Sequence, residues 1–367
     1  MRLAKPPEII GTGLIALDIV VGCGSEAPAL AAGGTCGNVL AIMGFMGWRS
    51  CPVARLRSDY AAKTIMRDLE RCNVGLDYAK CRPGGSTPIV LERVSRDGAG
   101  QGQHRFGFRC PQCGARYPGY QAVCASAVRG VIEQIKNPAV FFMDRLSRGA
   151  LLLAEACAAK GAMVVFEPSA NCDPKLFREA VAVAHVMKYS AARANDLGDL
   201  PVKNSLLLEI ETSGHEGLRF RSWLPASTTN EWRYLGAYDV ANVKDTAGCG
   251  DWCTAGILRK IGPEGLAGLR KITDKDLVEA MKYGQAAAAW NCGFEGARGG
   301  MNHVDLARFE AEIVRIMAGN RMTTNTKQPD AGPTKQLLER LCAACSRRGK
   351  PRRSASRQKR RSAAKGR

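Results

Sequence analysis

The 367-residue chain lacks the long apolar run that a membrane-spanning helix needs. No stretch reaches the roughly 18 to 20 consecutive apolar residues that cross a bilayer. The N-terminus carries Arg2 and Lys5 but has no apolar core before Pro6 and Pro7, so a secretory signal is not expected. These absences predict a cytoplasmic protein without a membrane partner.

Acidic residues are scarce: the chain has 34 Asp and Glu against 53 Lys and Arg, a formal net charge of +19. Residues 346–367 contain eleven Lys or Arg and no acid, which leaves about +8 for the rest of the chain. We expect this segment to be a disordered basic tail, preceded by a linker and short helix over residues 323–345. It could bind nucleic acid or another polyanion by counterion release, or serve only as a solubilising extension.

Cysteine is plentiful, with 15 residues in a chain that shows no export signal. That usage indicates a reducing compartment and argues against a disulfide framework. Most of these cysteines, such as Cys157 and Cys292, stand in apolar or glycine-rich contexts and are expected to behave as small hydrophobic residues.

Cys110 and Cys113 have the spacing with which two thiolates grip one tetrahedral metal ion. A structural zinc site needs four ligands, and no second cysteine pair is adjacent. His104 and Cys124 could complete a site locally, at unusual spacing. Residues 342–345 offer another Cys-x-x-Cys, although their helical flanks suit a zinc knuckle poorly. A zinc site, a metal-free hairpin and a redox dithiol therefore remain open.

Short apolar runs alternate with helical patterns in the middle of the chain. Residues 139–143 and 163–166 read as buried strands, and residues 151–159 read as a helix between them. This alternation predicts an α/β fold with a doubly wound, mostly parallel sheet.

The most informative segment is Asp-Thr-Ala-Gly-Cys-Gly-Asp at residues 245–251. It lies between an apparent strand, residues 238–243, and a helical pattern, residues 252–258. Glycines at such a turn let backbone N–H groups approach an anion at a helix N-terminus. A carboxylate in the first helical turn can then serve as a base, a combination that suits phosphoryl transfer. The alternative is an ordinary glycine-rich connection with a capping Asp.

The heptapeptide resembles the Asp-Thr-x-Gly-Ala-Gly-Asp signature of the PfkB family of ribokinase-like sugar and nucleoside kinases. Further similarities follow in order over about residues 7–318. They are a first strand at 9–13 with Leu17-Asp18, a Gly-Gly-x-x-x-Asn turn at 33–38, a strand returning from the lid at 86–92, Glu-Pro-Ser at 167–169, Thr-x-Gly-x-x-Gly at 212–217, and a helix and loop at 283–300.

The resemblance implies a kinase domain over residues 1–322 with a small β lid. It implies transfer of the ATP γ-phosphate to a hydroxyl of a sugar or sugar-like substrate, with Mg²⁺ and in some relatives a monovalent cation. The roles it implies are these: Asp251 as the base, with Gly248, Cys249 and Gly250 as N–H donors; Asp18, Gly33, Gly34 and Asn38 for the acceptor; Thr212, Gly214 and Gly217 for the nucleotide phosphates; Asp245 and Thr246 for the cation. A homodimer is expected. Residues 97–124 depart from the family pattern and are expected to form an insert at the lid edge.

Two departures bear on activity. Where the family has Asn-x-x-Glu, which organises magnesium, this chain has Ser190 and Arg193. A guanidinium cannot replace a carboxylate as a metal ligand, so Glu167 or Glu211 would have to substitute, or Arg193 would contact phosphate. Two alternatives therefore stay open beside the sugar kinase: a weakly active or inactive sugar- or nucleotide-binding regulator, and a nucleoside kinase.

Cys249 replaces the usual Ala of the signature. At a helix N-terminus its thiol pKa could fall and its reactivity rise. The other interpretation is that it substitutes passively for Ala.

Overall fold

The computed structural model describes residues 5–21, 29–96, 102–169, 172–194, 205–321 and 340–348. Most of the predicted linker and the tail beyond residue 348 lie outside the described residues.

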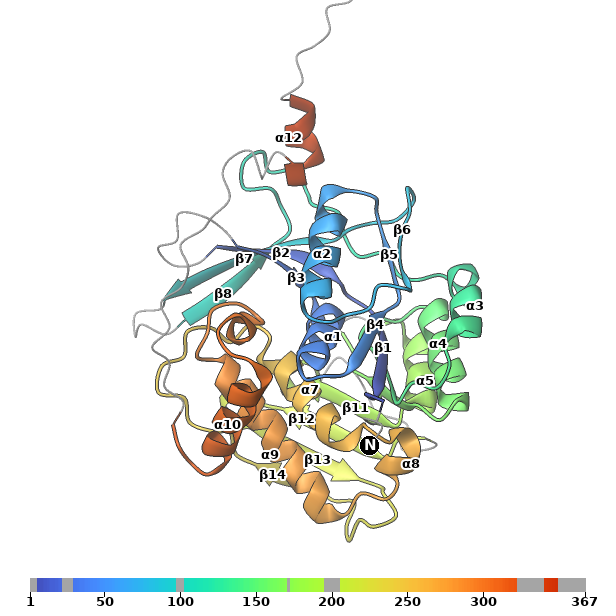
Figure 1. Cartoon of the computed structure of the whole chain (residues 1–367), viewed down its shortest axis with the longest axis vertical. Coiled ribbons are helices and arrows are strands. Elements are labelled where there is room, and N and C mark those ends of the chain that lie inside the picture. Colours follow the sequence, from blue (N-terminus) through green and yellow to red (C-terminus); the bar gives the residue numbers. More distant parts are fainter. Residues whose placement is uncertain are drawn as a thin grey trace, which may run out of the picture.

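An eight-stranded sheet forms the centre of the molecule, in the order β14-β13-β12-β11-β10-β9-β1-β4 (Figure 1). Every pair from β4 to β12 is parallel, whereas β13 and β14 join the far edge antiparallel. The strands are β1 (Glu8–Thr12), β4 (Arg49–Pro52), β9 (Val140–Met143), β10 (Met163–Phe166), β11 (Val186–Ser190), β12 (Leu208–Thr212), β13 (Leu218–Ser222) and β14 (Arg233–Leu235). The predicted mostly parallel sheet is confirmed.

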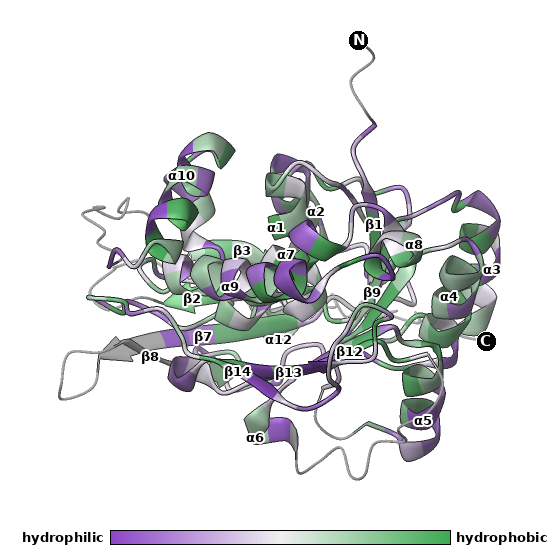
Figure 2. Cartoon of the chain, turned by 90° about the horizontal axis from the view of Figure 1, so that it is seen from below, coloured by the Kyte–Doolittle hydropathy of each residue, from purple (hydrophilic) through white to green (hydrophobic). Residues whose placement is uncertain are grey.

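Helices cover both faces of this sheet because its inner strands are apolar on both sides. Ile9 and Phe142 belong to one hydrophobic core, and their neighbours Ile10 and Phe141 belong to the other, as the period of two in a strand requires. Figure 2 shows β1 and β9 as apolar and β13, next to the edge strand β14, as more polar. The helices of the first core are α1 (Thr35–Phe45), α7 (Cys249–Ile261), α9 (Asp274–Asn291) and α10 (Leu306–Met317); those of the second are α3 (Ala125–Gln134), α4 (Arg148–Ala159) and α5 (Pro174–Val183). Shorter helical segments are α6 (Ala191–Ala194), α8 (Gly265–Leu269), η1 (Gly214–Glu216) and η2 (Gly299–Asn302).

A second sheet of four strands, β3-β2-β7-β8, forms the lid beside α2 (Tyr60–Arg71) (Figure 1). Its strands are β2 (Ala16–Val21), β3 (Ala29–Gly33), β7 (Ile89–Arg96) and β8 (Gly102–Gly107), and a small pair, β5 (Ala54–Leu56) and β6 (Ala79–Cys81), lies nearby. Asp18 was expected at the end of the first strand. It lies instead within β2, because the chain leaves the central sheet after Thr12 and enters the lid.

One local prediction was wrong. Residues 238–243 form no strand; Val240 makes only an isolated bridge, and Tyr238 and Val240 pack on the first core without a partner strand. Within the predicted lid-edge insert (residues 97–124), β8 pairs antiparallel with β7 and is an edge strand of the lid sheet. By contrast, β9, β10 and α4 confirm the alternation predicted from residues 139–166.

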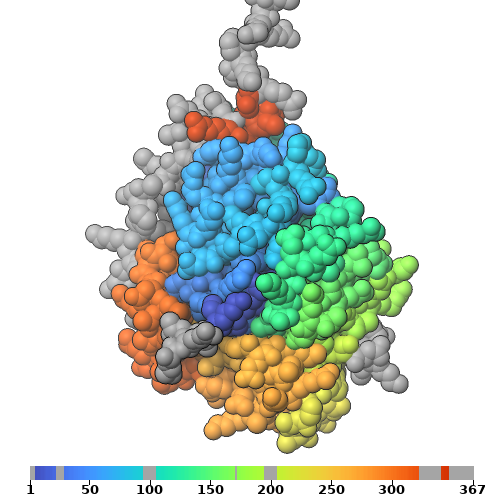
Figure 3. Space-filling model, turned by 45° about the vertical axis from the view of Figure 1, so that its right-hand side comes forward, coloured from blue at the N-terminus to red at the C-terminus, as the bar shows by residue number. Residues whose placement is uncertain are grey.

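The described C-terminal segment, residues 340–348, is helical at Arg340 and Leu341 and ends in α12 (Ala343–Arg348). It packs on the first core through buried Leu341, Cys342 and Cys345. Figure 3 shows this segment, in red, against the blue and cyan surface of the N-terminal part of the chain. Among the described residues, we find no helix with the length and apolar character to cross a membrane.

Candidate active site

The turn at residues 245–251, called the anion turn below, is built as the glycine pattern predicts. Gly248 has a left-handed φ of 71° and caps α7, and a Cβ there would collide with the Ala297 backbone. Asp245 fastens the turn to the loop after α9, because its two carboxylate oxygens accept hydrogen bonds from Ala247 N and Gly296 N, both at 2.9 Å. The N-terminus of α7 and its backbone N–H groups are thereby held in one orientation.

Asp251 lies in the first turn of α7 and is buried. Its Oδ2 accepts a 2.8 Å hydrogen bond from Asn38 Nδ2, so two predicted site residues that are 213 positions apart meet. Burial and the nearby Glu167 carboxylate raise the pKa of Asp251 to about 8, against the lowering effects of Asn38 and Lys188. A carboxyl with that pKa is suited to accepting a proton near neutral pH.

Lys188 is a site residue that the sequence interpretation missed. It projects from β11, is buried, and its Nζ donates to Glu167 Oε1 at 3.0 Å. Thr254 Oγ1 donates to the other oxygen of Glu167 at 2.8 Å. Burial is the largest single effect and lowers the pKa of Lys188, but Glu167, Cys253 and Asp251 together outweigh it, so that the pKa is raised. Lys188 therefore remains a cation that faces the anion turn, where a Cβ on Gly250 would lie 3.9 Å from its Nζ.

The predicted acceptor residues gather between the lid and α1. Gly33 ends β3 and leaves room for the Asp18 carboxylate, which a Cβ would displace, and Gly34 caps α1 with a φ of 81°. Burial raises the pKa of Asp18 to about 7, with Arg298 acting in the opposite direction. Asn38 Oδ1 is buried and accepts no hydrogen bond from the described residues, which leaves it available to a hydroxyl.

Asp144, at the carboxyl end of β9, is a second residue that was missed. It is almost fully buried; it accepts a hydrogen bond from Leu14 N at 2.9 Å and pairs with Arg145 at 2.6 Å. Burial raises the pKa of Asp144 to about 6. Gly13 makes room for this carboxylate, because a Cβ would overlap it. A buried acid directly after an apolar strand was the available signal.

The predicted nucleotide residues lie at the ends of β12 and β13. Thr212 ends β12, Gly214 begins η1 with a φ of 58°, and Gly217 has a φ of 106°. Gly217 lines a groove of about 310 Å³ together with Arg219 and Tyr234. Glu211 lines the same groove and pairs with Arg219 at 2.8 Å.

Several solved structures share this architecture, and each of the three given below aligns with this chain over nearly all of its own length. A fructokinase from Vibrio cholerae, with fructose, ADP and potassium bound, has a TM-score of 0.64 at 17% identity and covers 85% of this chain and 100% of its own. A Burkholderia thailandensis nucleoside kinase in complex with inosine has a TM-score of 0.62 at 14% identity, covering 87% and 100%. An aminoimidazole riboside kinase from Salmonella enterica, with aminoimidazole riboside and an ATP analogue, has a TM-score of 0.61 at 16% identity, covering 83% and 99%.

The fold is ribokinase-like. The resemblance drawn from the sequence motifs is therefore confirmed at the level of the fold. No family model matches the sequence, and no curated protein sequence does.

One departure from the ribokinase-like pattern can now be placed. Arg193 lies on α6 with an exposed side chain, and its Nη1 is 3.4 Å from the carbonyl oxygen of Pro168. Of the two proposed substitutes for the missing Glu, Glu211 is paired with Arg219 and Glu167 with Lys188. Glu167 is the one that lies beside Asp251.

Cys249 does not have the lowered pKa that one interpretation expected. Its thiol lies 3.0 Å from the Cys292 thiol. That contact, burial, and the carboxylates of Asp245 and Asp251 raise its pKa well above the usual value. The arrangement favours the passive interpretation of this residue.

Cys110 and Cys113 do not meet Cys124, which stands at the N-cap of α3 beside Ser126. They meet Cys342 and Cys345, and ligand atoms of the four lie within 4.8 Å of one another. The four thiols could hold a metal ion. The His104 side chain lies outside the described residues.

Proposed function

We propose that the chain is an ATP-dependent kinase of the PfkB type that transfers the γ-phosphate to a hydroxyl of a sugar or sugar-like substrate. The observation that carries this proposal is the juxtaposition of Asp251, Asn38 and the α7 N-terminus. A proton acceptor, a hydroxyl-binding amide and a set of anion-binding N–H groups share one buried site.

In the proposed reaction Asp251 accepts the proton of the attacking hydroxyl. Gly248, Cys249 and Gly250 direct backbone N–H groups at the transferring phosphoryl oxygens. Lys188, held by Glu167, adds a fixed positive charge on the same side. Because these groups are already in place, little reorganisation accompanies the reaction.

The acceptor pocket is proposed to contain Asp18, Gly33, Gly34, Asn38 and Asp144. These residues offer carboxylate and amide oxygens in a buried setting, and polar hydroxyls are the groups that can satisfy them. The glycines allow the backbone to approach the substrate closely. The fructose, inosine and aminoimidazole riboside of the three similar structures all carry such hydroxyls.

The nucleotide is proposed to bind along the groove beside Gly217, with Thr212 and Gly214 at its phosphates. Mg²⁺ prefers a few carboxylates together with substrate phosphates, and Glu167 is the carboxylate that fits this need at the anion turn. Bound Mg²⁺ would neutralise charge on the phosphates. A monovalent cation would use Asp245 and Thr246, whose turn is already closed by hydrogen bonds.

A nucleoside kinase is the second candidate, because nucleoside kinases are among the similar structures. A regulator with weak or no turnover is the third, favoured only by Arg193 in place of the family Glu. A cytoplasmic location and a homodimer remain predictions.

A screen of ADP release over sugars and nucleosides tests the proposal, with Asp251→Asn as the decisive variant. Asn keeps the size of the side chain and can still bond to Asn38, but it cannot accept a proton. We expect turnover to fall at least about 100-fold, the low end of general-base catalysis, while nucleotide binding measured by calorimetry stays near wild type.

The control is Asp276→Asn. Asp276 is an exposed carboxylate that caps α9 and has no role in the proposed active site. If Asp251→Asn kept more than about a tenth of wild-type turnover, the assignment of the base would be wrong. Nucleotide binding without turnover on any acceptor would favour the regulator.

A further inference from the structure

Two cysteine pairs from distant parts of the chain converge at the lid edge. Cys110 Sγ lies 3.8 Å from Cys345 Sγ, and Cys113 Sγ lies 3.5 Å from Cys342 Sγ, across separations of 235 and 229 residues. In a tetrahedral site with zinc–sulfur bonds of about 2.3 Å, the sulfurs lie about 3.8 Å apart. These two distances are close to the edge of such a tetrahedron, and all four sulfurs lie within 4.8 Å of one another.

The two pairs also have the same local geometry. The backbone N–H groups of Gln112 and Cys113, two and three residues further along the chain, lie toward the Cys110 thiol. Those of Ala344 and Cys345 lie toward the Cys342 thiol at the same two offsets. N–H groups so placed can hold the direction of thiolates that bind a metal.

The first pair is held by a tight hairpin. Arg109 and Arg116 form a bridge across it, Gly114 turns the chain with a φ of 71°, and Gly114 N donates to Cys110 O at 2.9 Å. Cys342 lies at a break between two helical segments: Arg340 and Leu341 are helical, Cys342 is not, and α12 begins at Ala343.

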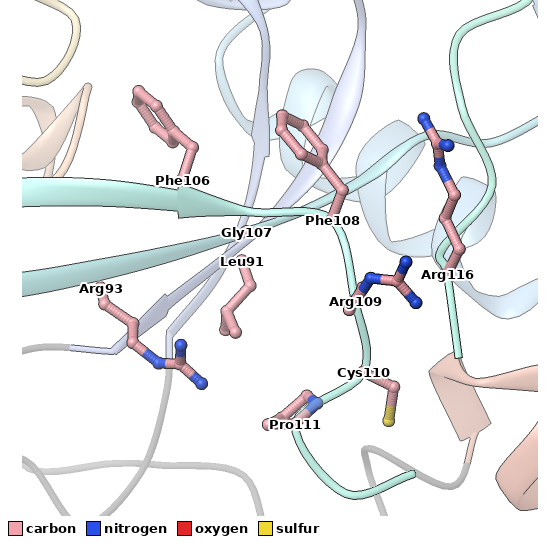
Figure 4. Close-up of a pocket in the computed structure, with 9 residues that line it drawn as sticks. All are labelled: Leu91, Arg93, Phe106, Gly107, Phe108, Arg109, Cys110, Pro111 and Arg116. Carbon is pink, nitrogen blue, oxygen red and sulfur yellow. The ribbon is translucent and has the colours of Figure 1, made fainter. Parts of the chain in front are cut away.

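The surroundings suit a closed structural site. Cys110, Cys342 and Cys345 are buried, and Tyr117 and Leu341 are buried in the same core. One zinc ion with four thiolates has a formal charge of minus two, and arginines nearby can balance it. Arg109 and Arg116 line a groove of about 440 Å³ next to Cys110, whose thiol points away from Phe106 and Phe108 (Figure 4).

We propose that Cys110, Cys113, Cys342 and Cys345 bind one zinc ion, which joins the lid-edge insert to the C-terminal segment. The site is a closed Cys₄ centre with a structural role, because four protein ligands leave no open position for a substrate. Residues 340–348 thereby become part of the folded body.

The site fixes the base of the lid as well as the C-terminal segment. After the hairpin the chain returns along β7, where Pro118 O accepts from Ile89 N and Gly119 O accepts from Ser86 Oγ at 2.6 Å. Arg340 lies over the Tyr60 ring at the start of α2, 5.7 Å from its centre. One metal ion therefore connects the insert, the lid and α2.

The test is the zinc content of full-length protein purified without chelator, measured by elemental analysis. We expect about one zinc ion per chain in wild type and loss of it in Cys342→Ser and Cys345→Ser. The matched control is Cys124→Ser, which removes the cysteine that would complete a local site and should keep the metal. Far-ultraviolet circular dichroism checks that each variant is folded.

Measurements on the unaltered protein keep the proposal testable if the variants do not fold. A strong chelator should release zinc from wild type and lower its Tm, and added zinc should restore both. Co²⁺ in place of zinc should give the intense bands of a tetrahedral thiolate site. Retention of zinc in Cys342→Ser, or no zinc uptake with disulfides between these cysteines, would overturn the proposal. None of these readouts depends on kinase activity.

Discussion

At the scale of single residues, the site depends on ionisable groups that the fold has buried. Asp251, Asp144 and Asp18 are all carboxyls with raised pKa values, and burial is the main cause for each. Lys188 lies near Asp251 and keeps its charge. The site thus combines a fixed positive charge with carboxyls that titrate close to neutral pH.

The raised pKa of Asp251 predicts a pH-dependent reaction. Only the carboxylate form can accept a proton, and with a pKa of about 8 most of this group is protonated at pH 6. We expect kcat/KM to rise about tenfold per pH unit below that value and to level off above it. A profile of kcat/KM from pH 6 to 9 measures this. A flat profile between pH 6 and 8 would contradict the assignment.

Cys249 is expected to be dispensable for chemistry. Its thiol has a raised pKa and contacts Cys292, and its backbone N–H helps to form the anion turn by donating to Thr246 O at 3.3 Å. Cys249→Ala should therefore keep turnover within about threefold of wild type, since the N–H remains. Steady-state kinetics checks this, with Cys292→Ala as the companion variant. A loss near 100-fold would show that the thiol itself takes part.

At the scale of elements, local motifs predicted some parts well. The heptapeptide at residues 245–251 identified Asp251 and the helix N-terminus because glycine spacing and a first-turn acid have direct conformational consequences. β9, α4 and β10 followed from the alternation of apolar runs. The strand predicted at 238–243 failed because Tyr238 and Val240 are apolar for packing on the core, not for pairing.

Other parts required the tertiary structure. Lys188 stands in an apolar strand, and that position was a usable signal of a buried charge. The sequence could not show its partner, because Glu167 directly follows β10, the strand that pairs with β11. Asn38 and Asp251 meet only because α1 packs against α7. Spacing could not reveal the four-cysteine cluster, since its halves are more than 200 residues apart.

The α6 segment carries the departure that bears most on the metal. If Arg193 occupies the position of the magnesium-organising Glu, Arg193→Glu should lower the Mg²⁺ concentration needed for half-maximal turnover by about threefold to tenfold, because a carboxylate attracts the ion. Arg193→Gln is the control that removes the guanidinium charge without adding a carboxylate. Magnesium titrations of turnover compare them. Equal midpoints for all three proteins would show that Glu167 already fills the role.

At the scale of the whole molecule, the position of α12 divides the C-terminal region in two. Residues 340–348 contact the body through Leu341, Cys342 and Cys345, whereas residues 349–367 hold nine of the eleven Lys and Arg found after residue 345. The sequence analysis ended the kinase domain at residue 322. Because residues 340–348 pack on the body, we expect the boundary of the part that can be removed without loss of stability to lie near residue 348.

Two truncations distinguish these boundaries. Removal of residues 349–367 takes away charge but no buried apolar area of the described structure, so Tm, turnover and zinc content should stay near wild type. Binding to duplex DNA, where present, should weaken and its dependence on salt should become less steep, since each phosphate contact contributes a log–log slope of nearly one.

Removal of all residues after 321, in contrast, should lower Tm as well as weaken DNA binding, because it deletes Leu341 and two of the proposed zinc ligands. Calorimetry, elemental analysis and salt titrations of DNA binding measure the three effects. Equal Tm and zinc content in both truncated proteins would mean that residues 340–348 contribute nothing to the folded body, and the boundary would return to residue 322.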